Sequence, residues 1–220
     1  MTTPTTPTTP VQGTARQHRA DAYVRRVLAL CESKRTRADL RSGLGRPVEQ
    51  CNYLHRYLVP LLPERMHPDG KRAHYAVAAL IAARPRVTRD ADTAAAAPCA
   101  GDGTGAGAGD GATSPWWQRP NLGTSLAQAV RVGGLKGDSA EGDLHLLTRQ
   151  STNAIHPRLP SLTQHLLRVG VAIDWPVLLE DLTWWNRDQD RIATRWLESY
   201  FRVVSAEDRT PTVPTHKDPS

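Results

Sequence analysis

Basic side chains are concentrated between residues 34 and 47, where Asp39 is the only acidic residue. The basic residues of this block are Lys34, Arg35, Arg37, Arg41 and Arg46. Guanidinium groups bind phosphate through charge and through paired hydrogen bonds. Arg37 and Arg41 are four residues apart and so share one face of a helix, while Arg46 follows on a glycine-bounded loop. The block therefore predicts contacts to the backbone of a nucleic acid.

The charge of the chain is distributed unevenly. Residues 16–86 contain 15 lysines and arginines but 6 acidic residues, whereas residues 121–204 contain nine of each. The basic excess therefore lies in the N-terminal half, where Arg25 and Arg26 precede the basic block. This asymmetry indicates a polyanionic partner, although a basic face that is merely solvated fits the count equally well. No zinc-finger, RRM or KH signature is present, so tracking of a nucleic-acid backbone is favoured over readout of its sequence.

Side chains for catalysis or metal binding do not form a convincing pattern. The three cysteines lack the CxxC spacing of a zinc or redox site, and the eight histidines are scattered. Glu180 and Asp181 are neighbours on a predicted helix and point about 100° apart, so we expect a solvated helix face there. We predict no catalytic residue, no metal and no cofactor. A cysteine-dependent enzyme that uses Cys31 stays open as a rival, although no base partner is evident.

The basic block has to be positioned by helices, because no stretch shows the alternation of a strand. We expect Thr36 to cap the short helix that carries Arg37 and Arg41, and Gly43 to end it in a left-handed conformation. The other predicted helices cover about residues 18–32, 48–62, 71–83, 122–131, 139–151, 160–169, 175–185 and 188–203. Tyr53 is expected on the buried face of the helix over 48–62. The predicted fold class is all-α.

The clearest helix begins after Ile173. Asp174 is a good N-cap, because its carboxylate accepts an amide hydrogen bond from the first turn, and Pro176 falls where a missing N–H costs nothing. An apolar stripe follows at spacings of three and four, namely Trp175, Leu178, Leu179, Leu182 and Trp185. The last predicted helix carries a second stripe of Ile192, Trp196, Tyr200 and Val203. Helices of this kind must bury their aromatic side chains against other helices.

Composition divides the chain into five segments. A Thr/Pro-rich tail at 1–17 and a second tail at 205–220 are predicted to be disordered. Residues 18–86 are predicted to form a basic helical bundle, and residues 116–204 a second bundle. The segment 87–115, rich in glycine and alanine, is predicted to be a flexible loop between the two. No apolar run is long enough to span a membrane and no signal peptide is evident, so a cytoplasmic location is expected.

Six motifs occur in a characteristic order along the chain. They read ADLR…GLGRP, LHRYLVPLLP, LIAARPR, NLGTSLAQAV, LHLLTRQ and IDWPVLLEDLTWWNRDQDRIATRWLESYF. This order resembles the small subunit of the type I-E CRISPR Cascade complex, the CasB family. The resemblance covers about residues 18–86 and 116–204, and its most specific part is the block DWPxLLxDLxWW. It implies an all-helical, non-catalytic subunit.

The resemblance also implies partners. In that family, two copies of the small subunit lie against the backbone subunits that hold the guide RNA. They stabilise the target strand and the displaced strand of the R-loop. In such complexes base pairing reads the sequence. The exchange of the DNA duplex for the RNA–DNA duplex is nearly balanced, and protein contacts to the strands help to tip it. The implied partners are other Cascade subunits, including the backbone subunits and a second copy of this chain, together with crRNA and target DNA.

Basic residues of this chain match basic positions of the family. Arg41 matches a residue of the second helix, Lys71 and Arg72 match the start of the fourth helix, and Arg149 ends the motif LxLLxR. The predicted nucleic-acid-binding residues are Arg41, Arg37, Arg46, Lys71 and Arg72, followed by Arg25, Arg26, Arg131 and Arg149. We therefore predict a non-catalytic, nucleic-acid-binding Cascade subunit that stabilises the R-loop in antiviral defence. The alternative is a helical protein-interaction scaffold with a solvated basic face.

Overall fold

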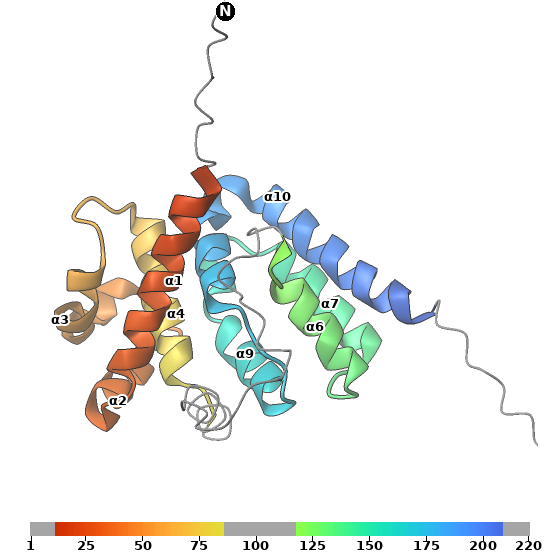
Figure 1. Ribbon diagram of the computed structural model, residues 1–220, viewed down its shortest axis with the longest axis horizontal. Helices are drawn as coiled ribbons and strands as arrows, with labels where there is room; N and C mark the ends of the chain where they lie inside the picture. Colours follow the sequence, from red (N-terminus) through yellow and green to blue (C-terminus); the bar gives the residue numbers. More distant parts are fainter. Residues whose placement is uncertain (1–11, 86–117, 209–220) are drawn as a thin grey trace, which may run out of the picture.

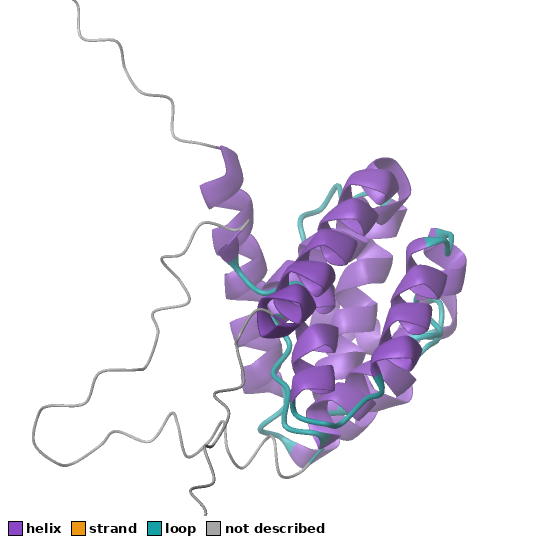
Figure 2. Cartoon of the chain, turned by 90° about the vertical axis from the view of Figure 1, so that its right-hand side faces the viewer, coloured by secondary structure: helices purple, strands orange, loops and turns teal. Residues whose placement is uncertain are grey.

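A computed structural model describes residues 12–85 and 118–208 of the 220-residue chain (Figure 1). Within these two ranges the chain forms helices, turns and loops and contains no strand (Figure 2). This confirms the predicted all-α class. The predicted loop at 87–115 and most of both predicted tails lie outside the described residues. The first helix begins at Gln12, inside the segment predicted as the N-terminal tail.

Short connections join most of the helices. In chain order the elements are α1 (Gln12–Leu30), α2 (Lys34–Ser42), the 3₁₀ turns η1 (Val48–Gln50) and η2 (Asn52–Leu54), α3 (His55–Leu58), the 3₁₀ turn η3 (Val59–Leu61), α4 (Pro68–Ala82), α6 (Leu122–Arg131), α7 (Gly137–Thr148), α8 (Thr152–Ile155), α9 (Leu159–Arg168) and α10 (Trp175–Asp208). In the described part of the chain, no helix is long and apolar enough to cross a membrane.

The longest helix, α10, organises the packing. It contacts α1, α4, α6 and α7, and in Figure 1 its second half extends outward along α6 and α7. Its N-cap is as predicted, because the carboxylate of Asp174 accepts a hydrogen bond from the amide of Val177 at 3.1 Å. Both predicted apolar stripes face the core. Their buried members are Trp175, Leu178, Leu179, Leu182, Trp185, Ile192, Trp196 and Tyr200.

The helices predicted at 175–185 and 188–203 are both present, as the two halves of α10 on either side of a kink. Asp188 has non-helical backbone angles (φ −122°, ψ 28°). Just after the kink, the side-chain amide of Gln189 donates to the carbonyl oxygens of Thr148 at 2.9 Å and Gln150 at 3.0 Å. The kink thus lies where α10 binds the end of α7.

Two fully buried tryptophans flank this kink. The rings of Trp185 and Trp196 are 4.9 Å apart between centroids. Trp185 donates its indole N–H to the carbonyl oxygen of Gln150 at 2.8 Å, and Trp196 donates to the carboxylate of Asp181 at 2.7 Å. Each indole therefore buries its large apolar area without leaving its polar atom unpaired.

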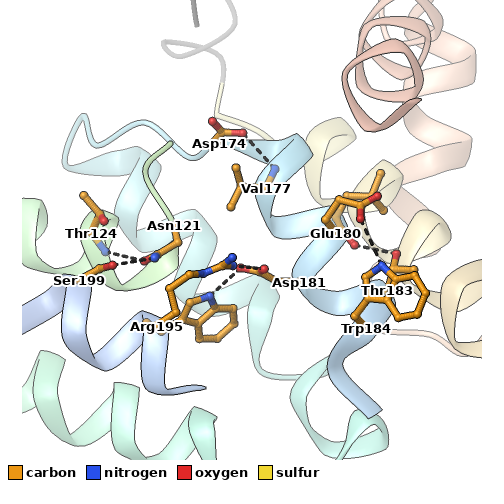
Figure 3. Close-up of polar contacts among 12 residues, drawn as sticks. Asn121, Thr124, Asp174, Val177, Glu180, Asp181, Thr183, Trp184, Arg195 and Ser199 are labelled. Carbon is orange, nitrogen blue, oxygen red and sulfur yellow. Dashed lines mark hydrogen bonds and ion pairs between the residues drawn. The ribbon is translucent and has the colours of Figure 1, made fainter. Parts of the chain in front are cut away.

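The prediction of a solvated face at Glu180 and Asp181 is wrong for Asp181. That side chain is 1% exposed and accepts hydrogen bonds from Arg195 and Trp196, both on the second half of α10 (Figure 3). Burial raises the pKa of Asp181 to about 6, and the Arg195 charge and the Trp196 hydrogen bond oppose that rise. The kink makes this possible, because it turns the second half of α10 and its Arg195 toward residues on the first half.

One hydrophobic core runs through both halves of the described chain. It joins Val27 and Leu58 of the N-terminal half to Leu126, Leu144 and Leu182 of the C-terminal half, all nearly or fully buried. α10 supplies the continuity, since it packs on α4 and α6 together. No gap in this core marks a boundary between two bundles, so the predicted division into two bundles stays a prediction.

The single helix predicted over 48–62 is wrong. The chain forms η1, η2, α3 and η3 in succession, and the ladder of helical hydrogen bonds is interrupted at Cys51 (φ −117°, ψ 35°). Tyr53, expected on the buried face, is 39% exposed, and its hydroxyl accepts a hydrogen bond from Ser42 at 2.8 Å. Apolar spacing alone could not distinguish a continuous helix from short turns that bury the same leucines.

Candidate nucleic-acid interface

Helix α2 carries two of the predicted phosphate contacts, Arg37 and Arg41. Its N-cap is Ser33, whose hydroxyl oxygen accepts from the amide of Thr36 at 3.4 Å, so the predicted cap at Thr36 is three residues late. The predicted left-handed end at Gly43 is also wrong, because Gly43 has φ −81°. Its lack of a side chain serves packing instead, since a Cβ there would lie 2.7 Å from a methyl carbon of Leu54.

The acidic residue of the basic block holds α2 in place. Asp39 accepts hydrogen bonds from the guanidinium of Arg56 at 2.8 Å and from the hydroxyl of Tyr57 at 2.7 Å. The Tyr57 hydrogen bond, with that of Arg56, lowers the pKa of Asp39 against a smaller opposing effect of burial. Leu40 beside it is fully buried. Asp39 thus faces α3, where it pairs with Arg56 and Tyr57, and its charge also acts on Arg35 of α2.

The arginines near this helix differ in their surroundings. Arg41 and Arg46 are exposed, whereas Arg37 is half-buried and donates to the backbone carbonyl of Cys31 at 3.4 Å. Arg25 and Arg26 are exposed on α1, which a short turn at 31–33 joins to α2. The structure thus places these five predicted residues on two consecutive helices and the loop that follows. We call them the α1–α2 arginine group.

Lys71 and Arg72 lie in a different setting, on the first turns of α4. Both are half-buried. The ammonium of Lys71 is 6.0 Å from the ring centroid of Tyr75, and Arg72 donates a hydrogen bond to the side-chain carbonyl of Asn153 on α8. Part of the binding capacity of each cation is therefore directed at the protein itself.

The last two predicted residues lie on the other half of the molecule. Arg131 is exposed in the last turn of α6, and Arg149 is exposed at the C-cap of α7. In Figure 1, α2 lies at one end of the molecule and α6 and α7 toward the other. The structure therefore does not gather all nine predicted residues on one element or at one end.

Sequence reasoning missed an arginine that joins distant segments. Arg119 donates to both carboxylate oxygens of Asp174 at 2.7 Å and to Asp21 at 2.9 Å, which links the start of α10 to α1. Burial alone would lower the pKa of Arg119, but its hydrogen bonds to the two carboxylates raise it. No local pattern indicates these contacts, because 98 residues separate Arg119 from Asp21.

A second missed feature is a cavity between α1, α4 and α10. Its lining includes Arg16, Arg19, Arg26, Arg65, Arg187 and Trp184. Of the predicted residues, this lining contains Arg26. The sequence signal was the spacing of Arg16, Arg19 and Arg26, which places them on one side of α1.

Cys31, the candidate nucleophile, and His67, one of the scattered histidines, have structural roles. Cys31 lies in the hydrophobic core at the end of α1, with its side chain 5% exposed. His67 caps α4, since its ring nitrogen accepts from the amide of Asp69 at 3.3 Å, and α4 thus begins three residues before the predicted start at 71. Within residues 12–85 and 118–208, no group of three His, Cys, Asp or Glu residues could hold a metal ion.

Comparison with known families decides the relationship of this chain. The family described as CRISPR-associated protein Cse2 matches residues 36–201. The chain belongs to the Cse2 family. This confirms the resemblance to CasB, the small subunit of type I-E Cascade, that the sequence motifs predicted. The matched residues include α2 from Thr36 onward and the whole segment from α6 to Phe201.

Solved structures agree with this Cse2 assignment. A chain of a CRISPR RNA-guided surveillance complex is 36% identical, with a TM-score of 0.71 over 88% of this chain and 98% of that chain. A chain of the complex in a pre-nicking state is also 36% identical, with a TM-score of 0.73 over 88% and 97%. CasB from M. ruber, 22% identical, has the same fold with a TM-score of 0.65 over 86% and 96%. None of the curated proteins matches the sequence.

Proposed function

We propose that this Cse2 family member is a non-catalytic subunit of a CRISPR RNA-guided surveillance complex that binds nucleic-acid strands. The observation that carries the proposal is the 36% identity to a chain of such a complex, over 98% of that chain. The subunit stabilises guide RNA–target DNA pairing and the displaced strand of the R-loop in cytoplasmic antiviral defence. Its partners are the backbone subunits, a second copy of itself, crRNA and target DNA.

The α1–α2 arginine group supports a direct role in strand binding. Four of its members, Arg25, Arg26, Arg41 and Arg46, are exposed. The acidic residue of the block, Asp39, is paired with Arg56 and Tyr57 on α3. Exposed guanidinium groups without an acidic neighbour to neutralise them attract phosphates of either strand regardless of sequence. Lys71, Arg72, Arg131 and Arg149 are assigned to further backbone contacts.

The binding role is tested by fluorescence anisotropy of the full chain with labelled single-stranded DNA, duplex DNA and RNA over a series of salt concentrations. We expect wild-type affinity to fall with salt, with a log–log slope of about −0.7 for each single-strand phosphate contacted. The variant Arg37→Ala/Arg41→Ala/Arg46→Ala should lose affinity and about two units of slope while its helical circular dichroism is retained.

A matched control variant is Arg158→Ala/Arg168→Ala/Arg202→Ala, which removes the same charge from exposed positions on α9, its N-cap and α10. It should keep most of the affinity. Equal losses in both triple variants would indicate non-specific attraction to net charge. If wild type binds none of the three nucleic acids at low salt, the result favours the alternative, a protein-interaction scaffold with a solvated basic face.

A further inference from the structure

The cavity between α1, α4 and α10 has a volume of about 960 Å³. Five exposed arginines line it, namely Arg16, Arg19, Arg26, Arg65 and Arg187. The two acidic side chains in the lining are Asp69 and Glu180. Positive charge therefore dominates the rim. Three of the arginines lie on α1, before the residues 36–201 that match the Cse2 family.

An aromatic ring lies within this ring of charge. Trp184 is half-buried, and its indole N–H donates to the carboxylate of Glu180 at 3.2 Å (Figure 3). The guanidinium carbon of Arg16 is 4.5 Å from the ring centroid, and that of Arg187 is 5.6 Å away. The hydrogen bond fixes the polar edge of the indole. Guanidinium groups already lie over its flat surface, so a base joins this stack by lying on a guanidinium plane or by taking the place of one.

The negative charge nearest to Trp184 is weakened by its surroundings. Burial raises the pKa of Glu180, while the Trp184 hydrogen bond and the charges of Arg16 and Arg19 oppose that rise. Its carboxylate is also occupied by the indole N–H. An anionic ligand therefore meets arginines at the rim, and the deeper acid is already paired.

The lining also has an apolar wall. Leu61, Leu62, Pro63 and Met66 come from the segment that leads into α4. A ligand that contacts all parts of the cavity needs a flat group that packs against Trp184 and this apolar wall. It also needs anionic oxygens that bind the arginines. A nucleotide combines a planar base with a phosphate. Bases of unpaired strands stack on aromatic rings and on guanidinium planes. In a duplex the base faces are already stacked on one another, so they are not available to the indole.

We propose that this cavity binds one or two unpaired nucleotides of a single strand, with a base against Trp184 and phosphates on the surrounding arginines. Arg16 and Arg26 are ten residues apart on α1, about 15 Å along the helix axis, which leaves room for more than one phosphate. The inference rests on the proposed function in that both require a nucleic-acid partner. It adds a site that recognises the base, which the α1–α2 arginine group does not require.

The test compares two fluorescein-labelled 12-mers of equal charge, oligothymidylate and an oligonucleotide of the same length whose internal positions are abasic. We expect the full chain to bind oligothymidylate about tenfold more tightly, because stacking is lost without the bases. Trp184→Leu should reduce this preference to less than about twofold, with the affinity for the abasic strand unchanged. An oligouridylate 12-mer then shows whether RNA or DNA fits the site better.

Arg16→Ala/Arg187→Ala changes exposed residues only and keeps the test valid if Trp184→Leu fails to fold. We expect it to weaken binding of both strands, whereas the control Arg158→Ala/Arg168→Ala should keep the affinity for both. Cross-linking of a 5-iodouracil oligonucleotide, mapped by mass spectrometry, should label the peptide that contains Trp184.

Several results would overturn the site. Equal wild-type affinity for the two strands excludes base recognition, and so does a preference that survives in Trp184→Leu. Competition by a glutamate 12-mer at the same concentration as oligothymidylate would indicate an acidic-peptide site, and no binding at low salt excludes the site in the free chain. The proposed function fails separately, when Arg37→Ala/Arg41→Ala/Arg46→Ala keeps its affinity and salt slope.

Discussion

Gly123 allows α6 to approach the backbone of α10 closely. A Cβ atom at this position of α6 would lie 1.9 Å from the backbone carbonyl oxygen of Trp196 on α10. Asn121 strengthens the same contact. Its side chain accepts from the amide of Thr124 at 3.2 Å and donates to the hydroxyl of Ser199 at 2.8 Å (Figure 3). The start of α6 is thus fixed on α10 by an absent side chain and a cap that bonds in two directions.

Gly123→Ala should therefore destabilise the protein by about 3 kcal/mol, because backbone on α10 has to move to admit the methyl group. Chemical denaturation followed by circular dichroism measures the change. Gly142→Ala is the matched control, since nothing lies within 4 Å of a Cβ at this exposed position of α7. The control should be neutral or stabilising by about 0.5–1 kcal/mol. Equal stability of Gly123→Ala and wild type would contradict the close contact.

At the scale of single residues, the features that could be predicted were those with a local cause. Asp174 was recognisable as a cap because the amide that it binds is three residues away. The roles of Gly123, Asp181 and Arg119 depend on atoms between 14 and 98 residues distant, and no local spacing reveals these contacts. The same holds for the cavity beside Trp184, whose walls come from three separate helices.

At the scale of elements, the junction of α4 and α8 contains a buried histidine. His156, which ends α8, is 5% exposed, and neither of its ring nitrogens has a hydrogen-bond partner. Burial, and then the nearby charge of Arg72, lower the pKa of His156 from 6.5 to about 4, while Asp69 opposes this. The folded protein therefore holds this ring neutral at pH values where the unfolded chain binds a proton.

This predicts an acid-sensitive contribution to stability. Between pH 6.5 and about 4 the unfolded state binds the proton of His156 more tightly, so the free energy of unfolding falls as the pH falls. His156→Leu should remove this loss, which is roughly 3 kcal/mol over the window. Urea denaturation of wild type and variant at pH 4.5, 5.5 and 7 gives the difference between the two curves.

The difference between the wild-type and His156→Leu stability curves is the informative quantity, because Asp181 changes the free energy of unfolding with pH in the opposite direction. The pKa of Asp181 is raised from 3.8 to about 6. Its contribution to the free energy of unfolding therefore falls as the pH rises from 3.8 to about 6, in wild type and variant alike. His18→Leu, on the exposed side of α1, is the control and should run parallel to wild type. A constant difference between wild type and His156→Leu from pH 4.5 to 7 would contradict the buried, neutral ring.

Prediction of elements succeeded where one apolar stripe continues for several turns. The stripes on α10 and the cap at Asp174 have local signals, and the structure contains them. The prediction of one helix over 48–62 failed because the short turns there bury leucines at spacings that a helix would also produce. The break in the pattern near Asp188 was read as a boundary between two helical segments, but sequence does not show that the kink brings Arg195 back to Asp181.

At the scale of the whole molecule, charge and packing are arranged separately. The hydrophobic core joins both halves through α10, whereas the basic excess belongs to residues 16–86. Motif order was enough to identify the Cse2 family from sequence, because its C-terminal block is long and rich in tryptophan. It could not place the nine predicted basic residues, which the structure distributes over α1, α2, α4, α6 and α7 and the loops beside them.

The lifetime of the R-loop in a reconstituted surveillance complex shows directly whether these arginines stabilise the strands. Complexes are assembled with wild type, with Arg37→Ala/Arg41→Ala/Arg46→Ala, or with the control Arg158→Ala/Arg168→Ala/Arg202→Ala, and subunit content is verified in each. Loss of three phosphate contacts should shorten the lifetime about tenfold or more at physiological salt, and the control should change it less than twofold. An unchanged lifetime in a complex that contains the first variant in full would contradict the proposed role of these arginines.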